Sequence, residues 1–192
     1  MPVTMKMKHW MLRLRAMAWL LAGRNGQAEA VFGRMLAQWP DDAYALASRS
    51  FVRAQAGRPD AAIEDAQRLV HAHPQRSAAD WFNLGYLLDA QRRHAEAVAA
   101  FERAVALDGR LDRAWYGLGL ALLRLGRHDD ALKALKRNTE LQPMSPYGWY
   151  QLARAHADCQ HPEEARKIIR HLRGFEPRVA EQLERETGLL AS

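Results

Sequence analysis

Eight histidines and one cysteine are the side chains of this 192-residue sequence best suited to catalysis or metal binding. His71 and His73 resemble a metal-binding pair, but Pro74 follows at once, and no cysteine or carboxylate cluster lies nearby in the sequence. Cys159 lies in an expected turn without an activating base. The sequence also carries no serine elbow, phosphate-binding loop or catalytic carboxylate pair. These observations predict a protein that is not an enzyme and that uses no cofactor or metal.

Composition and charge are those of a folded globular protein. Apolar residues make up 48% of the chain and charged residues 26%. The formal net charge is +6, but the basic residues are spread along the chain and alternate with Asp and Glu, so a nucleic-acid partner is not expected. A single cysteine excludes an intramolecular disulfide and favours a reducing compartment, which predicts a cytoplasmic location.

The first residues of the chain resemble a signal peptide, because Lys6 and Lys8 precede an apolar stretch. Arg13 and Arg15 interrupt that stretch, and its longest uncharged run, residues 16–23, is far below the ~18–20 residues that span a bilayer. We therefore expect folded structure to begin here, and we expect no membrane span.

A period of 34 residues dominates the chain. Trp81, Trp115 and Trp149 are each followed three residues later by Leu and then by a small residue. Upstream, the same step relates Pro40 to Pro74, and one extra residue near position 77 separates the two registers. We divide the chain into a basic lead at 1–8, five units at 9–42, 43–76, 78–111, 112–145 and 146–179, and a capping helix with tail at 180–192.

The residue pattern predicts two helices in each unit. In the fourth unit, Trp115, Leu118 and Leu122 are spaced by three and four residues, which places them on one helical face. Gly126 ends this first helix, and Pro143 follows the second one. Because the tryptophans are expected to hold one hairpin against the next, replacing Trp115 with Ala should cost about 3–5 kcal/mol of stability.

This pattern resembles that of the tetratricopeptide repeat family, with the best match over residues 78–177. The resemblance implies an all-α fold, an α-solenoid of five helical hairpins forming a right-handed superhelix, with a short C-terminal capping helix. The first two units depart from the pattern, because Arg15 and Arg49 occupy a position that holds Leu elsewhere. We therefore expect these two units to be looser than the others.

The resemblance also implies that the first helix of each unit lines a concave groove, and that the protein is an adaptor or scaffold for a protein or peptide. Asn83 and Arg113 match two positions of the carboxylate clamp of co-chaperone members, but Ala47, Phe51 and Gly117 fill other clamp positions, so that clamp is not expected. Aromatic and Arg side chains in the groove instead favour a ligand with acidic and apolar residues. The predicted groove residues are Tyr44, Phe51, Asn83, Tyr86, Arg113, Tyr116, Arg124, Tyr147, Tyr150 and Arg154.

An alternative function uses the end of the chain instead of the groove. The first helix is unusually apolar for a terminal repeat, which should present a polar outer face. Through Trp10, Met11, Leu14 and Met17 it could dock a second copy, a partner subunit or a membrane surface. The sequence leaves open the oligomeric state, the partner and the occupancy of the groove by the C-terminal tail.

Overall fold

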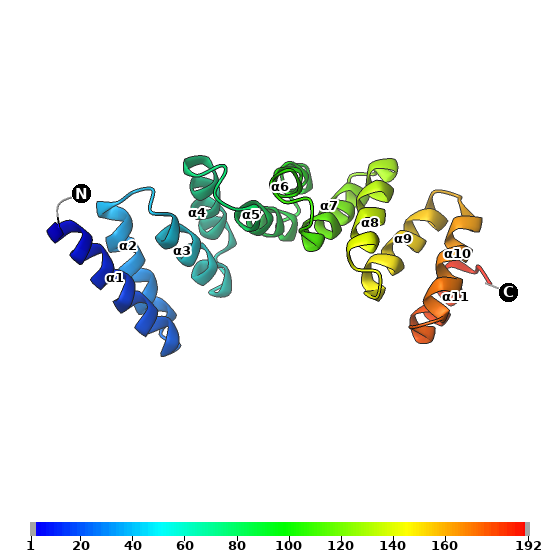
Figure 1. The fold of residues 1–192 in the computed structure, drawn as a ribbon, viewed down its shortest axis with the longest axis horizontal. Helices are drawn as coiled ribbons and strands as arrows, with labels where there is room; N and C mark the ends of the chain where they lie inside the picture. Colours follow the sequence, from blue (N-terminus) through cyan, green and yellow to red (C-terminus); the bar gives the residue numbers. More distant parts are fainter. Residues whose placement is uncertain (1–2, 191–192) are drawn as a thin grey trace. The chain divides into compact units, whose positions relative to one another are not determined.

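The computed structural model describes residues 3–190, and within them it contains eleven α-helices and no strand (Figure 1). The predicted all-α fold of tandem hairpins is confirmed. The chain also divides into two compact bodies that are larger than the repeats, and only these are called unit 1 and unit 2 below. Unit 1 extends up to Gln91 and unit 2 begins at Arg92, and the two are described separately. The helices are α1 (Val3–Leu21), α2 (Asn25–Gln38), α3 (Ala43–Gln55), α4 (Pro59–Ala72), α5 (Ala78–Ala90), α6 (His94–Leu107), α7 (Asp112–Arg124), α8 (His128–Leu141), α9 (Pro146–Asp158), α10 (Pro162–Arg173) and α11 (Pro177–Thr187).

A residue with positive φ follows the first helix of every repeat. Glycine fills three of these places, at Gly23, Gly57 and Gly126, with φ values of 67°, 71° and 72°. Arg92 and Gln160 occupy the equivalent places in the other two repeats, with φ values of 60° and 59°. A left-handed conformation costs a residue with a Cβ atom about 1–2 kcal/mol, so these two turns are strained relative to the glycine turns.

The repeated tryptophans fasten the loops that connect one hairpin to the next. Trp81, Trp115 and Trp149 are half-buried, and each indole N–H donates to a main-chain carbonyl oxygen at 2.8–3.0 Å. The acceptors, at Pro74, Gly109 and Pro143, all lie in the loop before the helix that carries the tryptophan. The period therefore repeats a hydrogen bond as well as a packing position.

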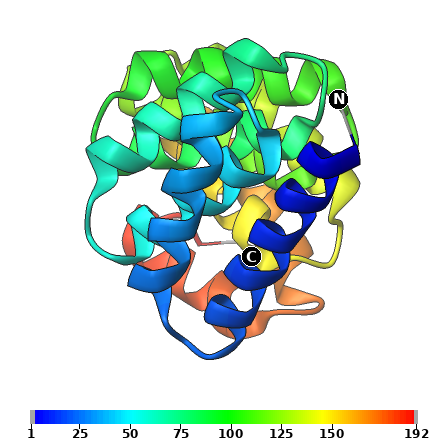
Figure 2. The ribbon, with the colours of Figure 1, turned by 90° about the vertical axis from the view of Figure 1, so that its left-hand side faces the viewer.

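Helices α1, α2 and α3 share an apolar core of unit 1 with Leu69 near the end of α4. Phe32, Met35 and Leu46 are fully buried in it. Figure 2 shows α1, in dark blue, with α2 beside it. Helix α1 begins at Val3, so the predicted lead at 1–8 is helical from there on, and residues 1 and 2 of that lead lie outside the described residues.

Arg49 of unit 1 forms a well-defined contact, although it occupies the position that holds Leu in other repeats. Its guanidinium group donates to both carboxylate oxygens of Asp65 on α4, at 2.8 and 2.6 Å. Ser50, the next residue of α3, donates to the Ala62 carbonyl oxygen at 2.8 Å. An ion pair and a hydrogen bond thus join α3 to α4.

Small residues allow close helix contacts in unit 2. A Cβ atom added to Gly119 would lie 2.7 Å from Cγ of the fully buried Leu135. One added to Gly148 would lie 2.2 Å from the side-chain oxygen of Asn138. Both distances are far shorter than the normal contact distance of a carbon atom. Helices α7 and α9 therefore approach α8 more closely than a residue with a Cβ atom would permit at these two positions.

Helix α11 packs on α9 and α10 at the end of unit 2, where Ala180 and Leu183 are fully buried. It begins at Pro177, three residues before the start predicted for the capping segment, and residues 191 and 192 of the tail lie outside the described residues. Across residues 3–190, every helix is too short or too polar to cross a membrane.

Candidate functional site

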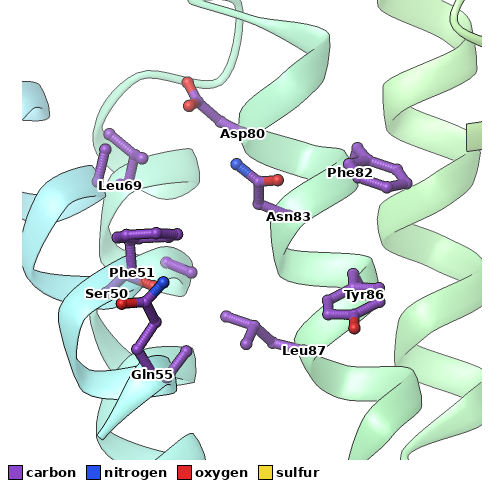
Figure 3. Close-up of a pocket in the computed structure, with 12 residues that line it drawn as sticks. Ser50, Phe51, Gln55, Leu69, Asp80, Phe82, Asn83, Tyr86 and Leu87 are labelled. Carbon is purple, nitrogen blue, oxygen red and sulfur yellow. The ribbon is translucent and has the colours of Figure 1, made fainter. Parts of the chain in front are cut away.

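A hollow of about 480 Å³ opens on unit 1 between α3, α4 and α5 (Figure 3). Its lining is mostly apolar and comes from all three helices. The lining residues are Ala47, Ser50, Phe51, Ala54, Gln55, Ala66, Leu69, Asp80, Phe82, Asn83, Tyr86 and Leu87.

Each of the two long walls of the hollow is formed by a pair of side chains four residues apart on one helix. Phe51 and Gln55 form the wall on α3, and Asn83 and Leu87 point toward them from α5 (Figure 3). Residues four apart share one helical face, so each wall combines an apolar side chain with a carboxamide. Small residues on α3 keep the space between the walls open.

Two aromatic rings of α5 also line the hollow. Phe82 and Tyr86 follow the next row of α5, and their ring centroids are 6.4 Å apart. Tyr86 is 63% exposed, and Phe51 on the opposite wall is 59% exposed. Large exposed aromatic side chains around a concave apolar surface are typical of protein-binding sites.

The charged and hydroxyl groups among the lining residues already have partners within unit 1. Arg76 donates to both carboxylate oxygens of Asp80, at 2.8 and 2.6 Å, and the Ser50 hydroxyl bonds to α4. Asp80 is therefore neutralised where it closes one end of the lining. The hollow favours an uncharged ligand.

Two carboxamides in the walls have free hydrogen-bonding capacity. Among residues 3–190, the side chains of Gln55 and Asn83 form no hydrogen bond, and both residues are exposed. A carboxamide both donates and accepts, which is the pairing that a peptide main chain offers. This arrangement can hold an extended backbone while the apolar walls take its side chains.

Of the four groove residues predicted in unit 1, the structure brings three to the hollow. Phe51, Asn83 and Tyr86 line it, but Tyr44 does not. The Tyr44 ring packs edge-on against Phe32, with centroids 5.9 Å apart, and the Arg13 guanidinium lies 4.3 Å from its centroid. Tyr44 is therefore covered by α1.

Most of the groove residues predicted in unit 2 contact other parts of the protein, and Tyr147 is the exception. Tyr116 and Tyr150 are partly buried against the core of unit 2. Arg113 and Arg124 already interact with other residues, and Arg154 lies 5.8 Å from the centroid of the Tyr150 ring. Tyr147 is 72% exposed at the start of α9.

The C-terminal helix occupies part of this predicted face. The Tyr150 hydroxyl donates to Glu186 of α11 at 2.5 Å. The bond raises the pKa of the Tyr150 hydroxyl, because the neutral phenol is the donor, and it lowers the pKa of the Glu186 carboxyl, because the carboxylate is the acceptor. Tyr150 is thus already bound to the chain.

The four residues predicted for end docking lie on the surface of α1. Trp10, Met11, Leu14 and Met17 are between 44% and 59% exposed. The same helix buries its opposite side against α2, with Ala16 fully buried and Leu12 partly buried.

His71 and His73 bond to the main chain, and the surroundings of Cys159 favour its neutral thiol. His71 Nδ1 donates to the Gln67 carbonyl oxygen and His73 Nε2 to that of Asp41, each at 2.6 Å. Burial raises the pKa of the Cys159 thiol, with Asp129 and Asp158 adding to the effect, which disfavours the nucleophilic thiolate. No group of three or more His, Cys, Asp or Glu side chains suited to a metal occurs within the described part of the chain.

The sequence did not indicate the bottom of the hollow. Ala66 and Leu69 belong to α4, the second helix of its hairpin, whereas the predicted groove used only first helices. Asp80 also escaped prediction, although Arg76 four residues before it is a recognisable ion-pair spacing. The lining depends on how three helices meet, which the repeat period does not encode.

A tetratricopeptide repeat family model matches the chain over residues 52–110, 82–143 and 116–174. These overlapping matches span residues 52–174, well over half of the sequence, and the chain belongs to the tetratricopeptide repeat family. A search of curated proteins found no match.

Solved structures of tetratricopeptide proteins share the fold. A crystal structure of MamA has a TM-score of 0.80 and 21% identity, covering 94% of this chain and 93% of that one. YrrB, described as a TPR protein with an unusual peptide-binding site, has a TM-score of 0.79 and 19% identity, covering 88% of both chains. PilF of Pseudomonas aeruginosa has a TM-score of 0.67 and 21% identity, covering 91% of this chain and 87% of that one. At these identities the likeness shows the fold.

Proposed function

We propose that this tetratricopeptide repeat protein is a non-enzymatic adaptor that binds an extended, uncharged peptide segment in the hollow of unit 1. The observation that carries the proposal is the pairing of apolar walls with the two unbonded carboxamides of Gln55 and Asn83. We further propose that it acts in the cytoplasm, as its single cysteine suggests.

The size and chemistry of the hollow support a peptide ligand. About 480 Å³ lies within the range of ~300–1,000 Å³ for ligand sites and accommodates one or two large apolar side chains. Apolar anchors supply most of the affinity, and hydrogen bonds to the main chain fix the direction of the ligand. YrrB, which has the same fold, is described as having a peptide-binding site.

The acidic feature predicted for the ligand belongs to unit 2 and is a separate proposal. It depends on Arg113, Arg124 and Arg154, whose guanidinium groups could receive carboxylates. The first two already interact within the protein, so an acidic ligand would have to replace existing contacts. The hollow of unit 1 requires no such exchange.

Selection of peptides from a random phage-displayed library tests the hollow. Fluorescence polarisation then measures a selected peptide against wild type, Phe51→Ala and Asn83→Ala. We expect Phe51→Ala to weaken binding by at least about 30-fold, as for a central aromatic anchor, and Asn83→Ala by about 3–10-fold.

Met144→Ala is the matched control, because Met144 is an exposed apolar residue, 67% exposed, in unit 2 and outside the hollow. Binding to Met144→Ala should equal binding to wild type. Peptides that bind Phe51→Ala as tightly as wild type would exclude the hollow as their site.

The exposed apolar face of α1 supports a second candidate function, in which this helix attaches the protein to another molecule or to a membrane surface. Met7, Trp10 and Leu14 are all large, apolar and exposed on this helix. The occupant of this face follows from the charges around it.

A further inference from the structure

We propose that α1 lies in the plane of an anionic lipid surface, with its exposed apolar face inserted at the boundary between headgroups and acyl chains. Met7, Leu14 and Leu21 repeat every seven residues, so they form a line along the side of α1 that faces away from α2. The line is about 21 Å long, at ~1.5 Å per residue.

Further apolar rows widen this line into a face. Trp10 and Met17 lie along one side of it, and Met11 and Ala18 along the other, again seven residues apart within each row. Every one of these residues is exposed. A helix that buries one apolar side in the core and presents a second to solvent has an unpartnered surface.

Cations border this face on both sides. Lys8 and Arg15 follow one edge, and Lys6 and Arg13 follow the other. Within residues 3–190 none of the four forms a salt bridge, although Arg13 stacks on Tyr44. Lysine and arginine on both sides of a Trp-, Met- and Leu-rich face are the features of helices that lie on anionic membranes.

The charge pattern argues against a second copy as the occupant. The segment from Val3 to Leu21 contains no Asp or Glu, so two α1 faces in contact would place like charges along both edges. The face is also the convex side of a single helix, and a lipid surface needs no complementary groove to receive it.

Flotation with lipid vesicles tests this inference on the full chain. The probes are vesicles of phosphatidylcholine alone and vesicles with one quarter phosphatidylglycerol, both at 150 mM salt. We expect binding to the anionic vesicles at least tenfold stronger than to the neutral ones, and weaker at higher salt. Leu14→Glu, checked for folding by circular dichroism, should abolish binding.

A charge-matched pair of variants separates α1 from the general +6 charge of the chain. Lys8→Gln with Arg15→Gln should weaken binding about 25-fold, at about fivefold per cation. Lys136→Gln with Arg170→Gln removes two exposed cations of unit 2 and should leave binding unchanged.

Three results would overturn the proposal. The first is equal binding to the two vesicle types, or binding to neither of them. The second is an equal loss of vesicle binding in the two charge-matched pairs of variants. The third is a concentration-dependent dimer, seen in light scattering, that the Leu14→Glu substitution dissociates. The last result would assign the face to a second copy. Peptide binding in the hollow is measured separately, so failure of one proposal does not affect the other.

Discussion

Replacing Arg49 with Leu would restore the residue that the repeat pattern prefers, yet we expect it to destabilise the protein. The Asp65 side chain is only 4% exposed and that of Arg49 16%. Arg49 donates to both carboxylate oxygens, and Arg53 provides a second cation at 3.1 Å. The substitution therefore leaves a buried carboxylate with one of its two arginines.

The magnitude follows from the burial of the pair. Removing one partner of a buried ion pair costs about 3–5 kcal/mol, because the remaining charge loses its compensation. Since Arg53 stays in place, we expect Arg49→Leu to cost about 2–4 kcal/mol. Changing Asp65 to Leu as well removes the stranded charge, so the double variant should lie within about 1 kcal/mol of wild type or above it.

A double-mutant cycle measures this coupling. Urea unfolding followed by circular dichroism compares wild type, the two single variants and the double variant. Hydrogen exchange over residues 43–72 locates the effect on α3 and α4, where opening should be easier in Arg49→Leu alone. The reasoning fails if Arg49→Leu is as stable as wild type, or if the double variant loses as much as the sum of the two single variants.

Four further substitutions or conditions test other parts of the fold. Gly148→Ala should cost about 1–4 kcal/mol in urea unfolding, because the new Cβ atom displaces the buried Asn138 side chain, whereas equal stability would refute the close contact. Gln160→Gly should raise stability by about 1 kcal/mol, seen as a higher melting temperature, because its turn requires positive φ. Trp115→Ala should cost about 3 kcal/mol, the lower end of the range for large core residues, because the ring is only half-buried, and an unchanged melting temperature would contradict this. Burial, with the nearby charge of a second histidine adding to it, lowers the pKa of His156 below its ordinary value of 6.5, so the unfolded chain takes up the proton first. Stability should therefore decline as the pH falls below about 6.5, and this decline should be smaller in His156→Gln when the two are melted at pH 7.5 and 5.5.

The helices were predictable because the residues that define them act locally. The tryptophan at the start of a first helix bonds to the loop six or seven residues before it, and a glycine such as Gly126 ends that helix. Interactions of this range repeat with the sequence period. Arg49 shows where the same reasoning fails, because its partner Asp65 lies on the next helix and has no place in the repeat pattern.

The exposure of the predicted groove residues could be derived only in part from the sequence, because it depends on what neighbouring elements place over a residue. Tyr44 and Phe51 are both aromatic and seven residues apart on α3, yet Arg13 of α1 covers the first and leaves the second exposed. Tyr150 is likewise bound by Glu186 of α11. Neither cover could be derived from a projection of single helices, since each comes from a segment at one end of the repeats.

The two proposed surfaces of unit 1 differ in chemistry, so they select different ligands. The hollow is uncharged in effect, because Arg76 neutralises Asp80, and its free groups are carboxamides. The face of α1 is bordered by cations and has no acidic residue. One apolar core runs from α1 through α3 to Leu69 of α4, which lines the hollow, so the two surfaces belong to one packed body. A helix fixed to a lipid surface would therefore hold the hollow in a defined orientation, which is the arrangement that an adaptor needs to present a bound peptide at that surface.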